Sequence, residues 1–427
     1  MKKLQLVVWL VACCGSYSQT IDKVITPGEV ERIEKILSAD DMQGRASFTL
    51  GIEKAANFIC SEFKAAGLQT RNNGDNYRQP FSMIRAKLIA ATDSLDEQSQ
   101  DPKNIIAFTS KPELILNQDS GFEKAFIRAG DNFFKEVLKY VQGDKNYLVL
   151  VDTAFSKNFG RLSGLKQQQF KSERSVVFVL TTLNPQTYKI SLKHEITESP
   201  LTNLVGILPG KNKRNEFVIF SAHYDHLGMG KPDDKMDSVF NGANDDASGC
   251  TAVIMLAKYF SKLNNNERTL IFATFTAEEI GGYGSQFFSK QLDPSKIMAM
   301  FNIEMIGTES KWGTNSAFIT GYDKTDMGEI LERNLEGSRF RFYPDPYPKE
   351  NLFYRSDNAS LARQGVPAHT ISTSKMDSEK YYHTRGDEIN TLDMNNMTEI
   401  IQAIALSSRS IVDGKDTPSR VTADKMR

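Results

Sequence analysis

The sequence predicts an α/β fold in which helices cover both faces of a mixed, mostly parallel central sheet, giving a three-layer sandwich. Two observations lead to this prediction. From about residue 196 onward, short apolar runs typical of buried strands alternate with amphipathic segments typical of helices. The chain also has 427 residues, of which 40% are hydrophobic and 25% are charged, so it has ample length for a large core.

The position of each element follows from this alternation. Two segments nearer the N-terminus, 28–38 and 51–67, repeat apolar residues at helical spacing, and the second closes on Gly67, a residue type that commonly ends helices. Beyond residue 196 we expect strands at 217–222, 270–276, 298–303 and 367–372, and helices at 248–263, 283–290 and 325–336.

Residues 85–195 stand apart from this alternation. We interpret them as an inserted α+β accessory or lid domain, because no cluster of chemistry-bearing residues falls there; elaborated loops on the main domain are the alternative. Within this insert we expect a helix at 121–141 and strands at 105–109, 147–151 and 176–180.

The insert divides the main domain in two. That domain is then formed by residues 27–84 and 196–412. Residues 413–427 form a polar tail, and we expect the stretch from Gly414 onward to be disordered.

The N-terminus has the pattern of a secretory signal peptide. Met1-Lys2-Lys3 precedes a short apolar stretch, and Ser16 and Ser18 supply the small residues of a cleavage site, so residues 1–18 are the expected signal. The alternative is a lipoprotein box that ends at Cys13, which would carry a lipid anchor. Either interpretation predicts an exported protein, periplasmic or extracellular, and no later run of the sequence is long and apolar enough to span a bilayer.

The remaining composition excludes several classes of protein. A formal net charge of −1 gives no argument for nucleic acid as a partner. Only Cys60 and Cys250 remain after the signal segment, which is too few for a disulfide framework or a thiolate zinc site. A single bridge between these two cysteines stays open at this point.

The adjacent carboxylates of Glu278 and Glu279 are the most informative polar feature. They follow a strand-like apolar run and precede Gly281 and Gly282. Adjacent carboxylates repel each other, and partly buried ones are costly unless a positive group compensates them. A metal cluster provides that compensation, with one glutamate bound to metal and its neighbour free to move a proton.

Four other runs place a potential ligand at a strand end or on a turn beside one. His223 ends a strand, and Asp225 lies two residues on, where a carboxylate could orient the imidazole. Asp245 lies on a turn that opens a helix, from which one carboxylate can reach two metals. Glu304 closes an otherwise apolar strand, and His383, flanked by aromatic residues, is one of only five histidines in the chain.

Two histidines and three or more carboxylates suit a hydrolytic site with two zinc ions. Two ions about 3.5–4 Å apart can share a water, lower its pKa and stabilise a tetrahedral intermediate. The reaction also needs a carboxylate that binds no metal and acts as general base beside the water. The pair Glu278 and Glu279 can supply one residue of each kind.

These five motifs, in this order, resemble peptidase family M28, which includes secreted bacterial aminopeptidases, glutamate carboxypeptidase II and, by divergence, glutaminyl cyclases. The resemblance covers residues ~30–70 and ~200–410 and leaves the insert unmatched. The segment from Ala39 to Arg45 is also similar to the N-terminal region of the family. The resemblance implies a zinc exopeptidase fold.

The resemblance also implies a ligand set. His223 and Glu304 would hold one zinc ion, and Glu279 and His383 would hold the other. Asp245 would bridge the two ions. The fourth carboxylate is usually aspartate in these aminopeptidases, so Glu304 is a departure, although its longer arm can still coordinate.

Further roles carry over by motif. Glu278 would be the general base, and Tyr382, directly before His383, would stabilise the oxyanion. The peptide bond between Asp245 and Asp246 would be cis. Three aspartates would support the ligands from behind: Asp225, Asp246 and Asp357.

Two nearby residues are assigned no part in the chemistry, and a third differs from the residue that is usual in the family. We interpret His226 as a loop residue near the site, and Asp387 as part of a solvated loop or a helix cap. Asn358 stands where many relatives have histidine, which leaves substrate preference open.

The sequence therefore predicts an exported metallo-exopeptidase, most specifically an aminopeptidase that removes N-terminal residues from peptides. One alternative is a glutaminyl cyclase, an acyltransferase on the same scaffold with one zinc ion. Another is a carboxypeptidase-type hydrolase of the same family. A binding protein that kept the fold without catalysis is a third alternative, and the completeness of the ligand set counts against it.

Overall fold

The computed structural model describes residues 21–71 and 76–422, and the chain forms two compact units within them. One unit combines the residues up to Pro80 with those from Leu201 onward, and the other comprises Phe81–Pro200. The predicted insert 85–195 lies within the second unit, whose limits are a few residues wider. Its role as a lid or accessory domain stays a prediction.

The first unit is built around a mixed sheet. In strand order the sheet runs β16-β15-β17-β14-β10-β13, followed by the end of β9. The strands β17, β14, β10 and β13 are parallel to one another. Strand β15 is antiparallel to β17 and parallel to β16, and β9 is antiparallel to β13. The strands are β1 (Gln69–Thr70), β9 (Tyr188–Leu208), β10 (Lys213–His223), β11 (Gly228–Met229), β12 (Val239–Phe240), β13 (Arg268–Phe275), β14 (Ile297–Ile303), β15 (Ser316–Ile319), β16 (Arg341–Pro344) and β17 (Ala368–Ser372).

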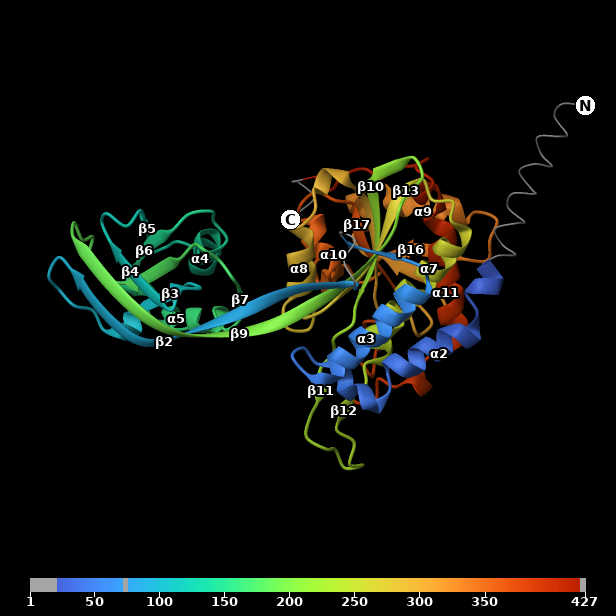
Figure 1. The fold of residues 1–427 in the computed structure, drawn as a ribbon, viewed down its shortest axis with the longest axis horizontal. Helices are drawn as coiled ribbons and strands as arrows, with labels where there is room; N and C mark the ends of the chain where they lie inside the picture. The colour runs from blue at the N-terminus through green and yellow to red at the C-terminus, as the bar shows by residue number, and fades with distance from the viewer. Residues whose placement is uncertain (1–20, 72–75, 423–427) are drawn as a thin grey trace, which may run out of the picture. The chain divides into compact units, whose positions relative to one another are not determined.

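Helices cover both faces of this sheet, as the sequence predicts (Figure 1). One face packs against α2, α3, α7, α9 and α11, and the other against α8 and α10. The helices are α2 (Pro27–Leu37), α3 (Leu50–Ala65), α7 (Ser248–Leu263), α8 (Tyr283–Ser289), α9 (Met327–Leu335), α10 (Asn358–Ala362), α11 (Met394–Ser407) and α12 (Arg409–Val412).

The three central strands are held in register by their alternating side chains. Phe220 of β10 lies opposite Phe272 of β13 and Phe301 of β14, and its ring stacks on theirs with centroids 5.6 and 5.0 Å apart. The neighbouring residues Ile219 and Ile271 point to the opposite core. A shift of one residue would exchange the two faces, so the apolar pattern fixes the register.

The second unit has its own sheet of order β3-β8-β6-β5, in which β5, β6 and β8 are parallel. Two apolar clusters, one on each side of this sheet, form its core. Its elements are β3 (Ile105–Phe108), β4 (Glu113–Asn117), β5 (Glu123–Ile127), α4 (Phe133–Val141), β6 (Tyr147–Val151), α5 (Ser156–Phe159), α6 (Leu162–Leu165), β7 (Gln169–Phe170) and β8 (Val176–Leu180), together with most of β2 (Arg78–Leu95) and β9.

Two expectations need correction, and the open question of a bridge between Cys60 and Cys250 is answered. The helix expected at 121–141 is wrong in its first half, because Glu123–Ile127 pairs with β6 as a strand and the helix begins at Phe133. The expected disorder from Gly414 onward is wrong for its described part, since Val421 is only 3% exposed. The two cysteines are free.

The remaining expectations concern the signal peptide and membrane-spanning segments. The expected signal peptide at 1–18, with Cys13, lies outside the described residues. Among the described residues, the helices are all too short or too polar to cross a membrane.

Candidate metal centre

The parallel strands bring three ligand-bearing segments to one edge of the sheet. His223 is the last residue of β10, and Glu304 directly follows β14. Glu278 and Glu279 lie three and four residues after the end of β13. Because β10 lies between β13 and β14 and runs parallel to both, the carboxyl ends of all three strands meet here.

Asp245 reaches this edge from the turn before α7. Its Oδ1 lies 3.1 Å from Nε2 of His223, and its Oδ2 lies 3.2 Å from Nε2 of His383. The side chain is buried, and the peptide bond to Asp246 is cis, as expected from the motif. One carboxylate therefore faces imidazoles on both of its sides.

Two groups of donor atoms share Asp245. One combines His223, Asp245 and Glu304, and the other combines His226, Asp245 and Glu279; within each group the donor atoms lie within 4.8 Å of one another. All are nitrogen or carboxylate oxygen, which zinc prefers. Oε2 of Glu304 is buried and has no hydrogen-bond partner among the described residues, as expected of an atom that faces a cation. The residues present therefore fit two zinc ions.

His383 joins the second group from its own loop. Its Nε2 lies 3.1 Å from Oε2 of Glu279, and its backbone takes a positive φ of 57°. The other carboxylate oxygen of Glu279 lies 2.8 Å from Nδ1 of His226. Glu279 thus stands between two imidazoles, one on each oxygen.

The position of His226 departs from the sequence-based interpretation. We expected a loop residue near the site, but the structure buries it inside the second donor group. The sequence signal was its place three residues after His223, directly beyond a strand end. Both histidines face Asp245, with His223 at 3.1 Å and His226 at 3.9 Å from its carboxylate oxygens.

The adjacent glutamates differ in their electrostatic surroundings. Burial raises the pKa of Glu279, but hydrogen bonds from His226 and His383 outweigh it and lower that pKa to about 2. Burial raises the pKa of Glu278 well above its usual range, and the nearby carboxylate of Glu304 raises it further. The pKa values of the two adjacent glutamates are therefore shifted in opposite directions.

Three aspartates hold the ligand-bearing backbone. We expected the carboxylate of Asp225 to orient His223, but Nδ1 of His223 contacts the backbone carbonyl of Asp225 instead, at 3.0 Å. Its carboxylate instead accepts the amides of Glu278 and Glu279 at 3.0 and 3.4 Å. Asp246 accepts the amides of His223, Gly249 and Met305.

Asp387 is the third of these aspartates, and it is another residue that the sequence reading missed. Its two oxygens accept the amides of Asn244 and Asp245 at 2.7 and 3.0 Å, and it is only 1% exposed. We expected a solvated loop or cap. The charge-rich sequence Arg-Gly-Asp-Glu favoured that interpretation, whereas only the fold brings this loop against the turn at Asp245.

Asp357, the remaining predicted support, is buried directly before α10, and burial raises its pKa to about 6. Asn358 begins that helix and serves the fold. It donates to the carbonyls of Phe353 and Ala368 and accepts from Thr370. These bonds give Asn358 a structural position behind the sheet edge.

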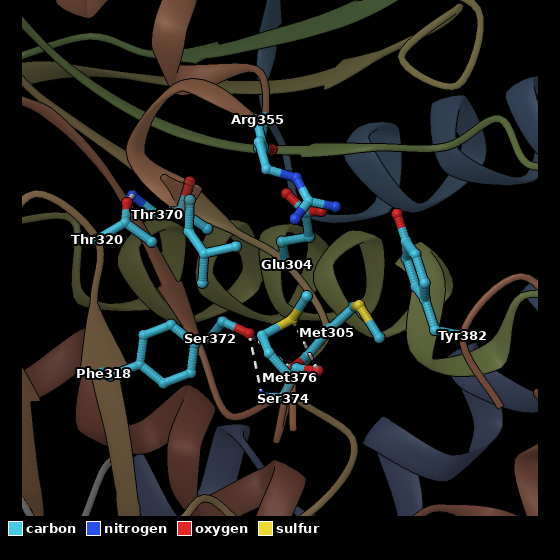
Figure 2. Close-up of a pocket in the computed structure, with 12 residues that line it drawn as sticks. Glu304, Met305, Phe318, Thr320, Arg355, Thr370, Ser372, Ser374, Met376 and Tyr382 are labelled. Carbon is cyan, nitrogen blue, oxygen red and sulfur yellow. Dashed lines mark hydrogen bonds between the residues drawn. The ribbon is translucent and has the colours of Figure 1, made fainter. Parts of the chain in front are cut away.

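A pocket of about 60 Å³ borders the first donor group and includes Glu304 in its wall. Figure 2 shows Tyr382 on one side of Glu304 and Arg355 directly above it, with Met305 and Met376 below. The ring of Tyr382 stacks on that of His383, with centroids 3.9 Å apart. The predicted ligand Glu304 and the predicted catalytic residue Tyr382 therefore line the same pocket, together with apolar and polar side chains.

Known proteins resemble this chain in sequence. The model of "Peptidase family M28" matches residues 203–407. Leucine aminopeptidase 1 of Blastomyces gilchristii is 31% identical over 216 residues, which cover 46% of this chain and 52% of that protein. Probable leucine aminopeptidase 2 of Arthroderma benhamiae is 26% identical over 400 residues, which cover 84% of this chain and 74% of that protein. The match to the first of these relatives spans about half of its length.

Solved structures share the fold. The aminopeptidase from Aneurinibacillus sp. strain AM-1 has a TM-score of 0.55 at 17% identity, covering 94% of this chain and 97% of that one. BSAP, a zinc aminopeptidase from Bacillus subtilis, has a TM-score of 0.55 at 17% identity, covering 91% and 95%. The fold is the α/β fold of these solved structures, and two groups of possible metal ligands lie at the carboxyl ends of its parallel strands. Residues 203–407 belong to peptidase family M28.

Proposed function

We propose that the protein is an exported aminopeptidase that uses two zinc ions to release N-terminal residues from peptides. The observation that carries this proposal is the pair of donor groups that share Asp245, with Glu278 adjacent in sequence to a member of the second group. In this proposal His223 and Glu304 hold one ion. Glu279 and His383 hold the other, with His226 as a further candidate ligand.

Each protein group then has a distinct task. Zinc ions, when bound, supply Lewis-acid chemistry that polarises the scissile carbonyl and lowers the pKa of the attacking water. Glu278 takes the proton of that water and delivers it to the leaving amine. The hydroxyl of Tyr382 donates a hydrogen bond to the oxyanion that develops on the carbonyl.

The substrate would place its N-terminal side chain in the pocket beside Glu304. Met305, Phe318, Leu352 and Met376 line this pocket and suit an aliphatic side chain, and methionine walls adapt readily to shape. The relatives described above are leucine aminopeptidases, which supports the same preference.

The test is a panel of aminoacyl-anilides and short peptides with zinc supplied. We expect release of leucine-like N-terminal residues, two zinc ions per chain, and no cleavage of N-acetylated peptides. Cleavage from the C-terminus would favour a carboxypeptidase instead. One tightly held zinc ion together with cyclisation of N-terminal glutamine would favour the glutaminyl cyclase alternative.

A further inference from the structure

A second cavity lies entirely within the 81–200 unit and has no part in the proposed catalysis. Its volume is about 610 Å³, and its walls are residues 85–88 of β2, the segment before β3, the start of β3, and residues from 160 to 167. This volume lies within the range of typical ligand pockets in proteins.

The walls of this cavity are basic. Arg85, Lys87, Lys103 and Lys166 line it, and its lining residues include no acidic side chain. Residues 81–200 as a whole contain 16 basic and 14 acidic residues, so the excess is local to the cavity. Arg85 and Lys87 lie two residues apart on β2 and are both exposed, which places them on one face of the strand.

The positive charges of the cavity are mostly not neutralised within the described part of the chain. There, only Lys87 among the four has a carboxylate within 4.0 Å, that of Glu195 at 3.8 Å, and both side chains of that pair are largely exposed. An exposed pair at that distance contributes little, so Lys87 can exchange its partner.

Lys166 is the most constrained of the four cations. It is half-buried, and its Nζ reaches one carbonyl, that of Ala107, at 3.5 Å. An ammonium group has three donors, so this long contact leaves it incompletely satisfied. The neighbouring His194 is neutral near pH 7, because burial and Lys166 lower the pKa of His194 to about 4. A carboxylate entering the cavity would meet this donor.

The rest of the lining discriminates between anionic ligands. Leu88, Ile105 and Ile106 line the cavity among the cations, and the lining includes no aromatic side chain. Bases need aromatic platforms for stacking, and this cavity provides none. Aliphatic walls among cations instead match a chain that alternates carboxylates with aliphatic groups.

We propose that this cavity binds an acidic peptide segment, with its carboxylates on Arg85, Lys103 and Lys166 and its aliphatic side chains on Leu88 and Ile106. This binding is independent of cleavage, so it can be tested on peptides blocked at both ends.

The test uses the full-length protein and a short peptide of alternating Glu and Leu, acetylated, amidated and labelled with a fluorophore. Fluorescence anisotropy should show binding that weakens with added salt, and little binding of the matched Gln-Leu peptide. The double substitution Arg85→Gln/Lys103→Gln should weaken binding at least about fivefold, since each exposed ion pair contributes modestly.

The matched control is Lys135→Gln/Lys189→Gln, which removes the same charge from exposed positions of the unit that do not line the cavity. It should leave binding unchanged. Equal weakening by both double substitutions, equal affinity for the Gln-Leu peptide, or binding of heparin with no binding of the acidic peptide would each overturn the proposal. Aminopeptidase activity of the cavity variants, measured in parallel, reports on the proposed function separately.

Discussion

The carboxylate of Asp225 holds the backbone amide of Glu278 at 3.0 Å, and it reaches the next amide, that of Glu279, at 3.4 Å. The same residue uses its backbone carbonyl to contact the imidazole of His223. Asp225 therefore sets one ligand and the backbone of the glutamate pair relative to each other, from opposite ends of a single residue.

The first prediction follows from this link. Asp225→Asn keeps the backbone carbonyl but replaces one of the two side-chain oxygens that accept the amides of Glu278 and Glu279. The glutamate pair should therefore lose its position while His223 keeps its contact. We expect kcat on leucyl-anilide to fall about 10–100-fold with little change in KM. Zinc content measured by mass spectrometry should stay near that of the unchanged protein, and a large loss of zinc would contradict this assignment.

The second prediction separates the roles of the glutamate pair. Glu278→Gln should lower kcat by about 10²–10⁴-fold and retain both zinc ions, because it removes a proton acceptor and no ligand. Glu279→Gln, which makes the same chemical change one residue away, should instead lose zinc. If Glu278→Gln loses zinc and Glu279→Gln keeps it, the two roles are exchanged.

The third prediction concerns the two histidines on Glu279. His383→Ala should lose one zinc ion and nearly all activity if His383 is a ligand. If His226 acts by orienting Glu279, His226→Ala should weaken the affinity for the same zinc ion about 10–100-fold, and excess zinc should restore activity. Competition titration with a chelating dye measures both affinities. An unchanged affinity in His226→Ala would leave His226 with a packing role only.

Arg45 gives the fourth prediction. Its guanidinium is only 1% exposed and donates to the carbonyls of Leu37, Tyr224, Asn241 and Gly242, at 2.6–3.0 Å. These contacts link the N-terminal segment to the strand end after His223 and to the turn before Asp245. Arg45→Met should lower the free energy of unfolding by about 3 kcal/mol or more, because several carbonyls lose their donor. Urea unfolding measures this change. Arg45→Lys should recover only part of the lost stability, since lysine lacks the planar guanidinium group that donates in several directions.

The fifth prediction is a pH dependence of stability. Glu34 is fully buried and hydrogen-bonds to Thr251, and burial raises its pKa to about 8. Between the ordinary value of 4.5 and about 8, the folded state keeps a proton that the unfolded state releases. Glu34 therefore stabilises the fold fully below pH 4.5, and this contribution is lost by about 1.4 kcal/mol per pH unit as pH rises toward 8.

Glu34→Gln tests this sign, because glutamine keeps the shape and cannot ionise. Urea unfolding at several pH values should show a stability that falls less steeply between pH 5 and 8 in the variant. Parallel curves for the two proteins would exclude Glu34 as the source.

The sequence predicted those parts of the site that depend on local pattern. His223 and Glu304 lie at the ends of strands that apolar runs mark clearly, and parallel pairing then brings such ends together. The boundaries of the corresponding strands and of α7 agree closely with expectation. Asp245 was found because a turn that opens a helix has a recognisable composition.

The sequence could not predict contacts that depend on how distant segments meet. Asp387 looks like a solvated charge in its own loop, and only the fold brings it against Asn244 and Asp245. The role of Asp225 was assigned to the wrong atoms, because spacing shows that two residues are close but not which oxygen faces the ring. At 123–127 the pairing with β6 overrode a helical pattern, as tertiary context often does.

The loop that carries His383 also carries Asp387, four residues on, which holds the amides of Asn244 and Asp245. One short stretch of chain thus supplies the imidazole of His383 to one donor group and, through Asp387, holds the backbone of Asp245, whose carboxylate both groups share. Opening this loop would release both groups in a single cooperative event. Hydrogen exchange at the amides of Asn244 and Asp245 should therefore report on zinc occupancy.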